Sequence, residues 1–281
     1  MIRKRIVNSV VHLILAVLSA IWLLPIFFAV LTSFRGEPGG PKTYIWPRIF
    51  TFDNYVGLFR SGTLNYARWF SNTFLVAVLS CILSLFFVLS VAYSMSRLRF
   101  TMRKPMLNIA LILGMFPGFM SMIAVYYILK GMGFLESGQL KLLALVLVYS
   151  GGAGLGFNIT KGFFDTVPKA LDEAAFLDGS TKWQTFTRII LPLSKPIIII
   201  TLIGSFMAPW TDFIFAKVIL GQDVEYYTIA IGLWTMLEKE YVEYYYTSFF
   251  AGCVLISIPI VILFLLTQKF YAESTAGAVK G

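Results

Sequence analysis

The sequence contains few charged residues. Only 13% of its 281 residues are Asp, Glu, Lys or Arg, which is about half the share found in soluble globular domains. Hydrophobic residues make up 58% of the chain, and the mean hydropathy is +0.79. So little charge argues against a soluble enzyme of this size, and so much apolar sequence argues against a disordered chain. The composition predicts a polytopic membrane protein.

Cysteine and histidine are also scarce. Cys81 and Cys253 are the two cysteines; both lie in apolar runs, where we expect them to pack rather than to form a disulfide framework. His12 is the one histidine, which leaves no histidine-based metal site. We therefore predict no metal site, no catalytic residue and no cofactor bound by this chain.

Six long segments carry no acidic or basic residue. Crossing about 30 Å of hydrocarbon takes roughly 20 apolar residues in a helix, and a segment in lipid must satisfy its own backbone hydrogen bonds. We therefore expect an all-α membrane protein with transmembrane helices at residues 10–31, 69–95, 105–129, 142–160, 196–211 and 244–268. The first follows a basic N-terminus as in a signal peptide, but its apolar core is too long for one, so we expect it to be retained.

The basic residues predict the orientation of these helices. If the N-terminus is cytoplasmic, the inner segments hold 14 basic and five acidic residues, and they are residues 1–9, 96–104, 161–195 and 269–281. The outer segments hold nine of each sign, and they are residues 32–68, 130–141 and 212–243. The whole excess of positive charge then lies inside, as the positive-inside rule predicts, with both termini cytoplasmic. Because the bases lie beside predicted spans rather than among stacking aromatics, nucleic-acid binding is not expected.

The longest predicted cytoplasmic loop, residues 161–195, encodes two short helices. Pro168 suits the first turn of the first helix, and Gly179 suits a left-handed cap at its end. On this helix, small Ala174 and Ala175 would let another protein surface approach closely.

The second short helix has a start signal and a stop signal. Thr181 followed by Gln184 is a capping-box pattern, which predicts a helix beginning there. We expect this helix to end at Leu191 and Pro192, because the residue before a proline disfavours the helical conformation.

The same loop resembles the EAA loop of ABC importer permeases. The resemblance is carried by Glu173, Ala174, Ala175, Asp178, Gly179, Ile189, Leu191 and Pro192. Ser180 departs from the pattern, since alanine is the common residue there. Beyond the EAA pattern, residues 149–152, 161–165, 192–194 and 275–281 resemble MalG-type permease subunits of maltose and maltodextrin importers. The resemblance is clearest from about residue 69 onward.

This resemblance implies a fold and a set of partners. The fold would be a type I ABC importer permease bundle in the bacterial plasma membrane, with its transmembrane domain at residues 69–270. The partners would be a second homologous permease, two cytoplasmic ABC ATPase subunits that bind ATP and Mg²⁺, and an external sugar-binding protein. The EAA residues would form a coupling helix that fits a groove of the ATPase. The implied cargo is a malto-oligosaccharide, with another oligosaccharide, such as a galacto-oligosaccharide, as the alternative.

Other readings of these features remain open. An acidic and alanine-rich helix can be an ordinary amphipathic surface helix. An ion-driven secondary transporter would need a buried ionisable residue at mid-membrane, and the six uncharged runs contain no Asp, Glu, Lys or Arg. A membrane scaffold without transport activity would give the EAA residues no role.

Polar and aromatic residues inside the predicted spans are candidates for a sugar pathway. Hydroxyl and amide groups can bond sugar hydroxyls, although such groups also join helices to one another. The candidates are Tyr93, Asn108, Ser121, Tyr149, Asn158, Ser205 and Trp210. Gly151 to Gly156 lacks the Lys of a phosphate-binding loop, so we interpret these glycines as helix-packing residues. Pro117 predicts a kink in the third span that either flexes or only shapes packing.

Overall fold

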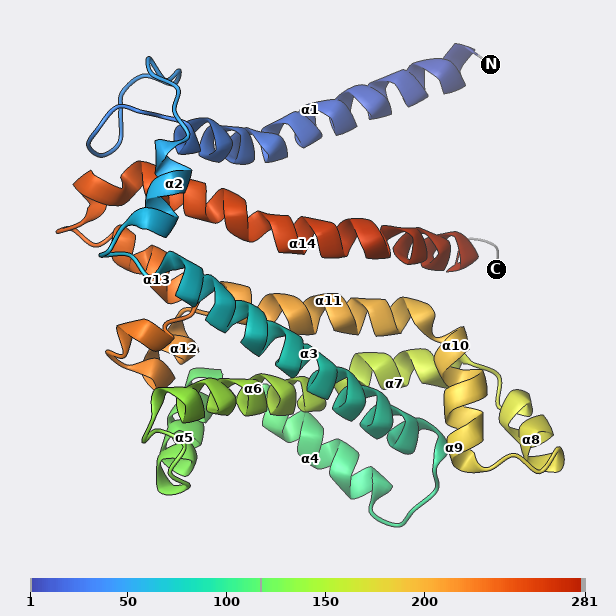
Figure 1. The fold of residues 1–281 in the computed structure, drawn as a ribbon. Coiled ribbons are helices and arrows are strands. Elements are labelled where there is room, and N and C mark those ends of the chain that lie inside the picture. The colour runs from blue at the N-terminus through green and yellow to red at the C-terminus, as the bar shows by residue number, and fades with distance from the viewer. Residues whose placement is uncertain (1, 117, 279–281) are drawn as a thin grey trace. The chain divides into compact units, whose positions relative to one another are not determined.

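A computed structural model describes residues 2–116 and 118–278 of the chain, and it is helical (Figure 1). Among these residues the side chains at 2–6, 119, 153–155 and 271–278 are not described. The described part of the chain contains no strand, and its one isolated bridge joins Arg35 to Phe50. The predicted all-α class is confirmed.

The helices follow one another closely along the chain. Their bounds are α1 Ile2–Ser33, α2 Asp53–Arg60, α3 Tyr66–Arg97, α4 Arg103–Met115, α5 Gly118–Gly131, α6 Gly138–Leu155, α7 Phe157–Thr166, α8 Ala170–Leu177, α9 Lys182–Thr185, η1 Phe186–Ile190, α10 Leu191–Leu193, α11 Lys195–Thr211, α12 Ile214–Leu220, η2 Val224–Tyr226, α13 Ile229–Met236 and α14 Val242–Ala278. Of the two short η elements, η1 is a π-helix and η2 a 3₁₀-helix.

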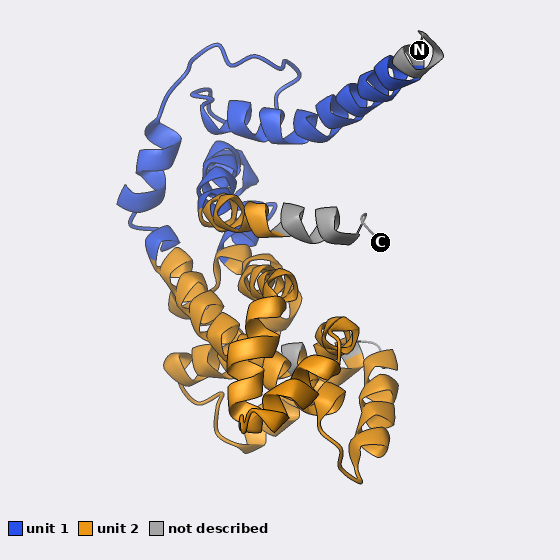
Figure 2. Cartoon of the chain, turned by 90° about the vertical axis from the view of Figure 1, so that its right-hand side faces the viewer, with its two compact units in different colours: residues 1–67, 232–258 blue, residues 68–231, 259–281 orange. Residues whose placement is uncertain are grey.

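The chain divides into two compact units (Figure 2). Unit 1 comprises residues 1–67 and 232–258, and unit 2 comprises residues 68–231 and 259–281. Helices α4 to α12 lie wholly in unit 2, together with nearly all of α3. Unit 2 therefore contains the candidate coupling loop and the candidate pathway residues.

In unit 1, α1 is apolar around its whole circumference and exposed. Its stretch Val7–Ser33 has no buried residue in its most apolar window, and Trp22 is 79% exposed. An exposed helix of this kind needs lipid or another apolar surface around it. Its C-terminal end is held by Asn54 of α2, whose side-chain amide donates to the carbonyls of Ser33 (2.9 Å) and Arg35 (2.8 Å).

Among the described residues, four helical stretches are long and apolar enough to cross a membrane. They are Val7–Ser33, Tyr66–Arg97, Gly138–Thr166 and Val242–Phe270. Two bent helix pairs raise the possible number to six, if each pair makes one span. Each of the six predicted spans falls within one of these stretches or pairs, and in the second pair only Lys195–Thr211 contains the predicted span.

The third predicted span is two helices rather than one kinked helix. Arg103–Met115 and Met120–Gly131 meet at 106°. Phe116 ends α4 in an extended conformation, with φ −71° and ψ 137°, which is the conformation imposed on a residue that precedes proline. Pro117 itself lies outside the described residues. Phe116 is therefore a described residue at which the chain leaves the helical path of α4.

The core of unit 2 joins the loop 161–195 to the helical bundle. Its buried members come from α3, α4, α7, η1, α11 and the residue after α7, and they are Val88, Ala92, Tyr93, Met95, Ala110, Phe157, Phe164, Val167, Phe186, Ile190 and Ile197. Because Phe186 and Ile190 of η1 are buried here, the C-terminal half of the loop is part of the bundle's packing.

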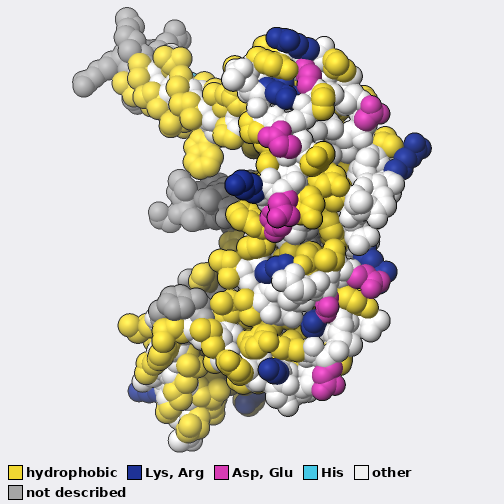
Figure 3. Space-filling model, turned by 90° about the vertical axis from the view of Figure 1, so that its left-hand side faces the viewer, with side chains coloured by type: hydrophobic (Ala, Val, Ile, Leu, Met, Phe, Trp, Pro, Cys, Tyr) yellow, Lys and Arg dark blue, Asp and Glu magenta, His cyan; other side chains and the backbone are white. Residues whose placement is uncertain are grey.

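On the face of the molecule in Figure 3, acidic and basic side chains both occur among apolar ones. Two of the ion pairs among the described residues of unit 2 join Lys141 to Asp223, and Arg68 to Glu225 at 2.7 Å. All four residues belong to segments that the sequence places outside the cell or at its outer edge, where the two signs balance.

Candidate functional site

Helix α8 is closed by the glycine that the sequence predicts. Gly179 has a φ of +79°, in the left-handed region. The amide of Gly179 donates to the carbonyl of Phe176 (3.0 Å), and the amide of Ser180 donates to that of Ala175 (2.9 Å). These two bonds form a Schellman motif, which satisfies the last carbonyls of the helix. The chain then turns directly into α9.

Helix α9 begins with the predicted capping box. The Thr181 hydroxyl accepts from the Gln184 amide (3.2 Å), while the Gln184 side chain accepts from the Thr181 amide (2.7 Å). Two short helices, each capped at the turn between them, form a rigid helical hairpin. We call residues 168–193 the coupling hairpin.

The predicted end of the second helix at Leu191 and Pro192 is wrong. The helix continues through the π-turn η1 and α10 to Leu193. The Leu191 amide donates to Phe186 O across the wider turn, and the helix continues past Pro192 although this residue has no N–H to donate. The helix ends before Ser194, where α11 leaves at 84° to it.

One side of the coupling hairpin is packed and the other is exposed. Of the EAA residues, Ala175 is buried, Ile189 and Leu191 are partly buried, and Glu173, Ala174, Asp178, Gly179 and Pro192 are exposed. Large apolar side chains are exposed beside them, at 77% for Phe176, 85% for Leu177 and 64% for Trp183. Large exposed apolar side chains grouped in this way are typical of a surface that binds protein or membrane.

Arg97, the last residue of α3, holds the first helix of the hairpin. Its Nη1 lies 3.0 Å from Asp172 Oδ2 of α8. Its Nη2 donates to the carbonyls of Phe164 and Val167, both at 2.7 Å. The Arg97 side chain is 5% exposed. One buried guanidinium thus joins α3, the end of α7 and α8, a geometry for which its planar, multi-donor group is suited.

Tyr93, one turn earlier on α3, holds the second helix. Its hydroxyl donates to Lys182 O (3.1 Å), and its ring lies 4.6 Å from that of Phe186. Tyr93 therefore contacts the coupling hairpin. It lines neither of the two apolar cavities described below, where a pathway residue would be expected.

Two substitutions of Tyr93 distinguish the contribution of its hydrogen bond from that of its ring packing. We expect Tyr93→Phe to lose about 1 kcal/mol of stability, because it removes one hydrogen bond to the hairpin. Tyr93→Ala is expected to lose about 3–5 kcal/mol, because it also opens a cavity beside Phe186. Thermal unfolding of the two purified variants measures the difference. Equal losses would show that the ring does not support the hairpin.

Two adjoining cavities contain some of the predicted pathway residues. One of about 520 Å³ is lined by Tyr149, Thr160, Thr201 and Ser205 among apolar residues, and one of about 570 Å³ is lined by Ser121 and Asp212. Both cavities also reach Val148, Gly152 and Phe215. The Tyr149 hydroxyl donates to Asp212 Oδ2 (2.7 Å), which connects their polar groups. A cavity with few, convergent polar groups is the usual form of a small-molecule site.

The remaining pathway candidates lie elsewhere. Asn108 is exposed on α4 and Asn158 is partly buried on α7, and neither lines the two cavities. Trp210 is 3% exposed, with its ring 5.2 Å from Phe70 and 5.9 Å from Phe206. The contacts of Trp210 are those of a core residue.

Sequence reasoning missed the residues that hold the hairpin. It counted Arg97 only as one of the 14 inner basic residues, and Asp172 only as one of the five inner acidic residues. Their pairing depends on the approach of α8 to the end of α3, 75 residues earlier in the chain, which local patterns do not encode. The available signal was the position of Arg97 as the first charge after a 28-residue uncharged run.

The fold and the hairpin together define an integral membrane transport subunit. The chain belongs to the family of binding-protein-dependent transport system inner membrane components, whose signature matches residues 89–275. This confirms the predicted resemblance and the predicted permease class. As a family member the chain is a permease subunit with several membrane-crossing helices.

Curated relatives match nearly the whole chain. The galactooligosaccharides transport system permease protein GanQ of Bacillus subtilis is 35% identical, covering 96% of this chain and 94% of the relative. The maltodextrin permease MalD of Streptococcus pneumoniae is 32% identical, covering 100% and 98%. The maltose/maltodextrin permease MalG of Escherichia coli is 32% identical, covering 97% and 95%.

A solved structure has the same fold. A chain of a bacterial ABC transporter that imports the acidic polysaccharide alginate superposes with a TM-score of 0.77 at 20% identity, covering 95% of this chain and 97% of that one. The same kind of transporter, in complex with a periplasmic protein bound to an alginate pentasaccharide, superposes with a TM-score of 0.68. The type I ABC importer permease bundle expected from the sequence is confirmed.

Proposed function

We propose that this chain is a permease subunit of an ATP-dependent bacterial importer of oligosaccharides, with malto-oligosaccharides as its cargo. Its role is to form half of the translocation pathway and to receive motion from a separate ATPase. Galacto-oligosaccharides are the second candidate cargo, and the 35% identity to a galactooligosaccharide permease over 96% of the chain supports them.

The observation that carries this proposal is the coupling hairpin. It exposes Phe176 and Leu177 near its tip and Glu173 in the first turn of α8, while Arg97 and Tyr93 fasten its two helices to α3. A free surface helix would have no need of a buried ion pair at its base. A hairpin that is rigid and fastened in this way can carry a push from a partner into the bundle, because packed interfaces move as units.

The two adjoining cavities support a passage for neutral sugar. Apart from Asp212, which also accepts from the amides of Phe215 and Ala216, the side chains lining them are apolar or hydroxyl-bearing. Hydroxyl groups can exchange hydrogen bonds with sugar hydroxyls without the cost of desolvating a free charge. Tyr149, Ser205 and Ser121 are the residues that we assign to this passage.

The partners follow from the permease role. A second homologous permease would complete the pathway, two cytoplasmic ATPase subunits would bind ATP and Mg²⁺, and an external binding protein would deliver the sugar. The surplus of basic residues in segments 1–9, 96–104, 161–195 and 269–281 supports an orientation with the hairpin and both termini in the cytoplasm.

Uptake by the source cell tests this function and its cargo. A strain lacking the gene is complemented with the wild-type chain, and uptake of labelled maltotriose is measured with and without excess unlabelled galactotriose. We expect restored uptake that galactotriose does not compete away. If the chain restores uptake of galactotriose and not of maltotriose, the cargo is a galacto-oligosaccharide. If it restores uptake of neither sugar, the proposed function is refuted.

A variant that fills the 520 Å³ cavity tests the passage, and a variant away from both cavities is its matched control. Gly204 lines the 520 Å³ cavity, and no atom lies within 4 Å of an added Cβ there. Gly204→Leu should therefore fold and assemble but lower uptake, because the side chain would occupy the passage. Gly114→Leu, on α4 and away from both cavities with equal free space, should leave uptake unchanged.

A further inference from the structure

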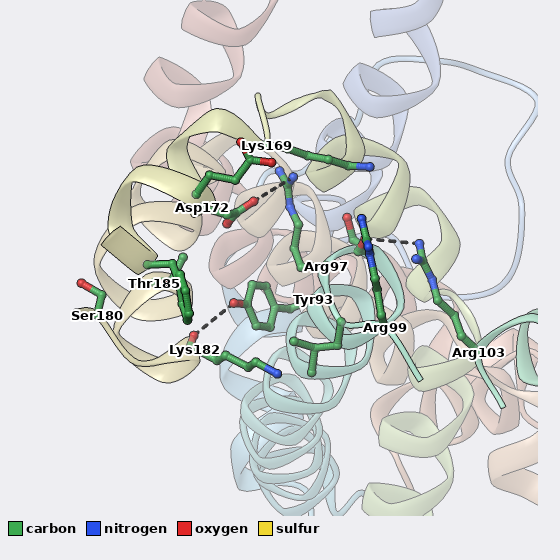
Figure 4. A pocket seen from close by; sticks show the side chains of 13 residues that line it. Tyr93, Arg97, Arg99, Arg103, Lys169, Asp172, Ser180, Lys182 and Thr185 are labelled. Carbon is green, nitrogen blue, oxygen red and sulfur yellow. Dashed lines mark hydrogen bonds and ion pairs between the residues drawn. The ribbon is translucent and has the colours of Figure 1, made fainter. Parts of the chain in front are cut away.

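A polar pocket of about 240 Å³ lies between the end of α3, the segment that follows it, and the coupling hairpin (Figure 4). Five of its lining residues are basic: Arg97, Arg99, Arg103, Lys169 and Lys182. Two are acidic, Asp172 and Glu173. This pocket is separate from the two apolar cavities, with which it shares no lining residue.

Most of the positive charge in this pocket is not neutralised by the protein. Arg97 and Asp172 pair with each other, which leaves four cations and Glu173. Among the described residues, no carboxylate forms an ion pair with Arg99, Arg103, Lys169 or Lys182. Arg103 donates to the carbonyl of Ser96 at 3.2 Å, and its charge is one of the causes that lower the pKa of Asp165, although the two residues form no ion pair. Like charges held in one pocket repel unless an anion joins them.

The charged ends converge from two parts of the chain. In Figure 4, Lys169 from the start of the hairpin and Arg99 and Arg103 from beyond α3 extend to the same side of Arg97, whereas Lys182 points away. Two guanidinium groups and an ammonium group in this arrangement match the several oxygens of a phosphate group, which arginine binds through paired N–H donors.

Apolar side chains beside these cations indicate where the phosphate comes from. Phe100 and Met102 lie between Arg99 and Arg103 in the sequence, and they are 39% and 56% exposed. A segment that presents bases and exposed apolar groups together suits the boundary between lipid headgroups and acyl chains. A soluble phosphate would not need the apolar groups.

We propose that Arg99, Arg103 and Lys169 bind the phosphate group of an anionic phospholipid in the cytoplasmic leaflet. The assignment to the cytoplasmic leaflet rests on the orientation given under the proposed function. The assignment of a phosphate site rests on the pocket alone. A lipid headgroup bound there bridges the α3–α4 segment and the coupling hairpin, so that the membrane itself stabilises the base of the hairpin.

Native mass spectrometry of the full-length chain tests this site. The protein is released from nanodiscs of phosphatidylglycerol and phosphatidylcholine in equal amounts, and retained lipid is identified. We expect retention of phosphatidylglycerol over phosphatidylcholine, lowered about five-fold for each cation removed in Arg99→Gln, Arg103→Gln and their double variant. The control is Arg188→Gln with Lys195→Gln, two exposed inner bases outside the pocket, which should retain lipid as the wild type does.

A second arm separates lipid from soluble phosphate. Thermal unfolding in neutral detergent is followed with inorganic phosphate, and then with short-chain phosphatidylglycerol. Stabilisation by the lipid alone, lost in Arg99→Gln/Arg103→Gln, supports the proposal. If inorganic phosphate stabilises the protein to the same extent, the pocket binds soluble phosphate rather than a lipid headgroup. Equal lipid loss in pocket and control variants, or no preference for phosphatidylglycerol, would overturn the site, and the uptake experiment is independent of all these outcomes.

Discussion

Replacing Gly179 with valine is expected to lower ATP-dependent uptake by about ten-fold or more. Gly179 has a φ of +79°, and a left-handed backbone costs an L-residue about 1–2 kcal/mol, more when it is β-branched. To avoid that strain the turn between α8 and α9 must change, which breaks the bonds from Gly179 and Ser180 to the end of α8. The hairpin tip would then no longer present Phe176 and Leu177 in one orientation.

The substitution acts through the backbone rather than through a clash. An added Cβ at Gly179 meets no atom within 4 Å, so side-chain size is not what the position excludes. Gly179→Asn is the matched control, since asparagine tolerates the left-handed region. We expect it to keep most of the uptake and of the co-purified ATPase. If valine and asparagine have the same effect, or if valine leaves uptake and ATPase assembly normal, the hairpin is not the coupling element.

Local signals in the sequence were sufficient for the hairpin and its caps. Gly179, Thr181 and Gln184 act on neighbours within five residues, and each has the geometry that its residue type predicts. The six apolar runs were likewise visible, because lipid exposure removes charge from a whole stretch of sequence. At Pro117 the sequence located the break but not its size, since a bend of 106° depends on the conformation of Phe116 as well.

What the sequence could not show is which side chains meet between distant helices. Tyr93 was one of seven pathway candidates in the predicted spans, and only the approach of the second hairpin helix to α3 makes it a contact of the hairpin. Tyr149 and Ser205 line one cavity while Asn108 does not. Hydroxyl and amide groups look alike in a helical span whether they face a cavity or a neighbouring helix, so a list of polar residues cannot separate the two.

Replacing Arg97 is expected to cause a large loss of folding stability. Removing one partner of a buried ion pair costs about 3–5 kcal/mol, and Arg97 also donates to the carbonyls of Phe164 and Val167. Because the Asp172 side chain is 24% exposed, we expect the lower end, about 3 kcal/mol, for Arg97→Met. Arg97→Lys keeps the charge but cannot reach three acceptors with one ammonium group, so its loss should be intermediate.

A double-mutant cycle with Asp172 tests whether the two residues act together. Asp172→Asn should cost less than Arg97→Met, because Arg97 keeps its two carbonyl partners. In the double variant no buried charge is left without its partner, so its loss should be smaller than the sum of the single losses. Thermal unfolding measures the stability terms, and ATP hydrolysis stimulated by the loaded binding protein measures coupling at a temperature where every variant is folded. Additive losses would show that the pair is not a unit. Normal stimulation in folded Arg97→Met would show that Arg97 supports the fold without transmitting motion from the hairpin to α3.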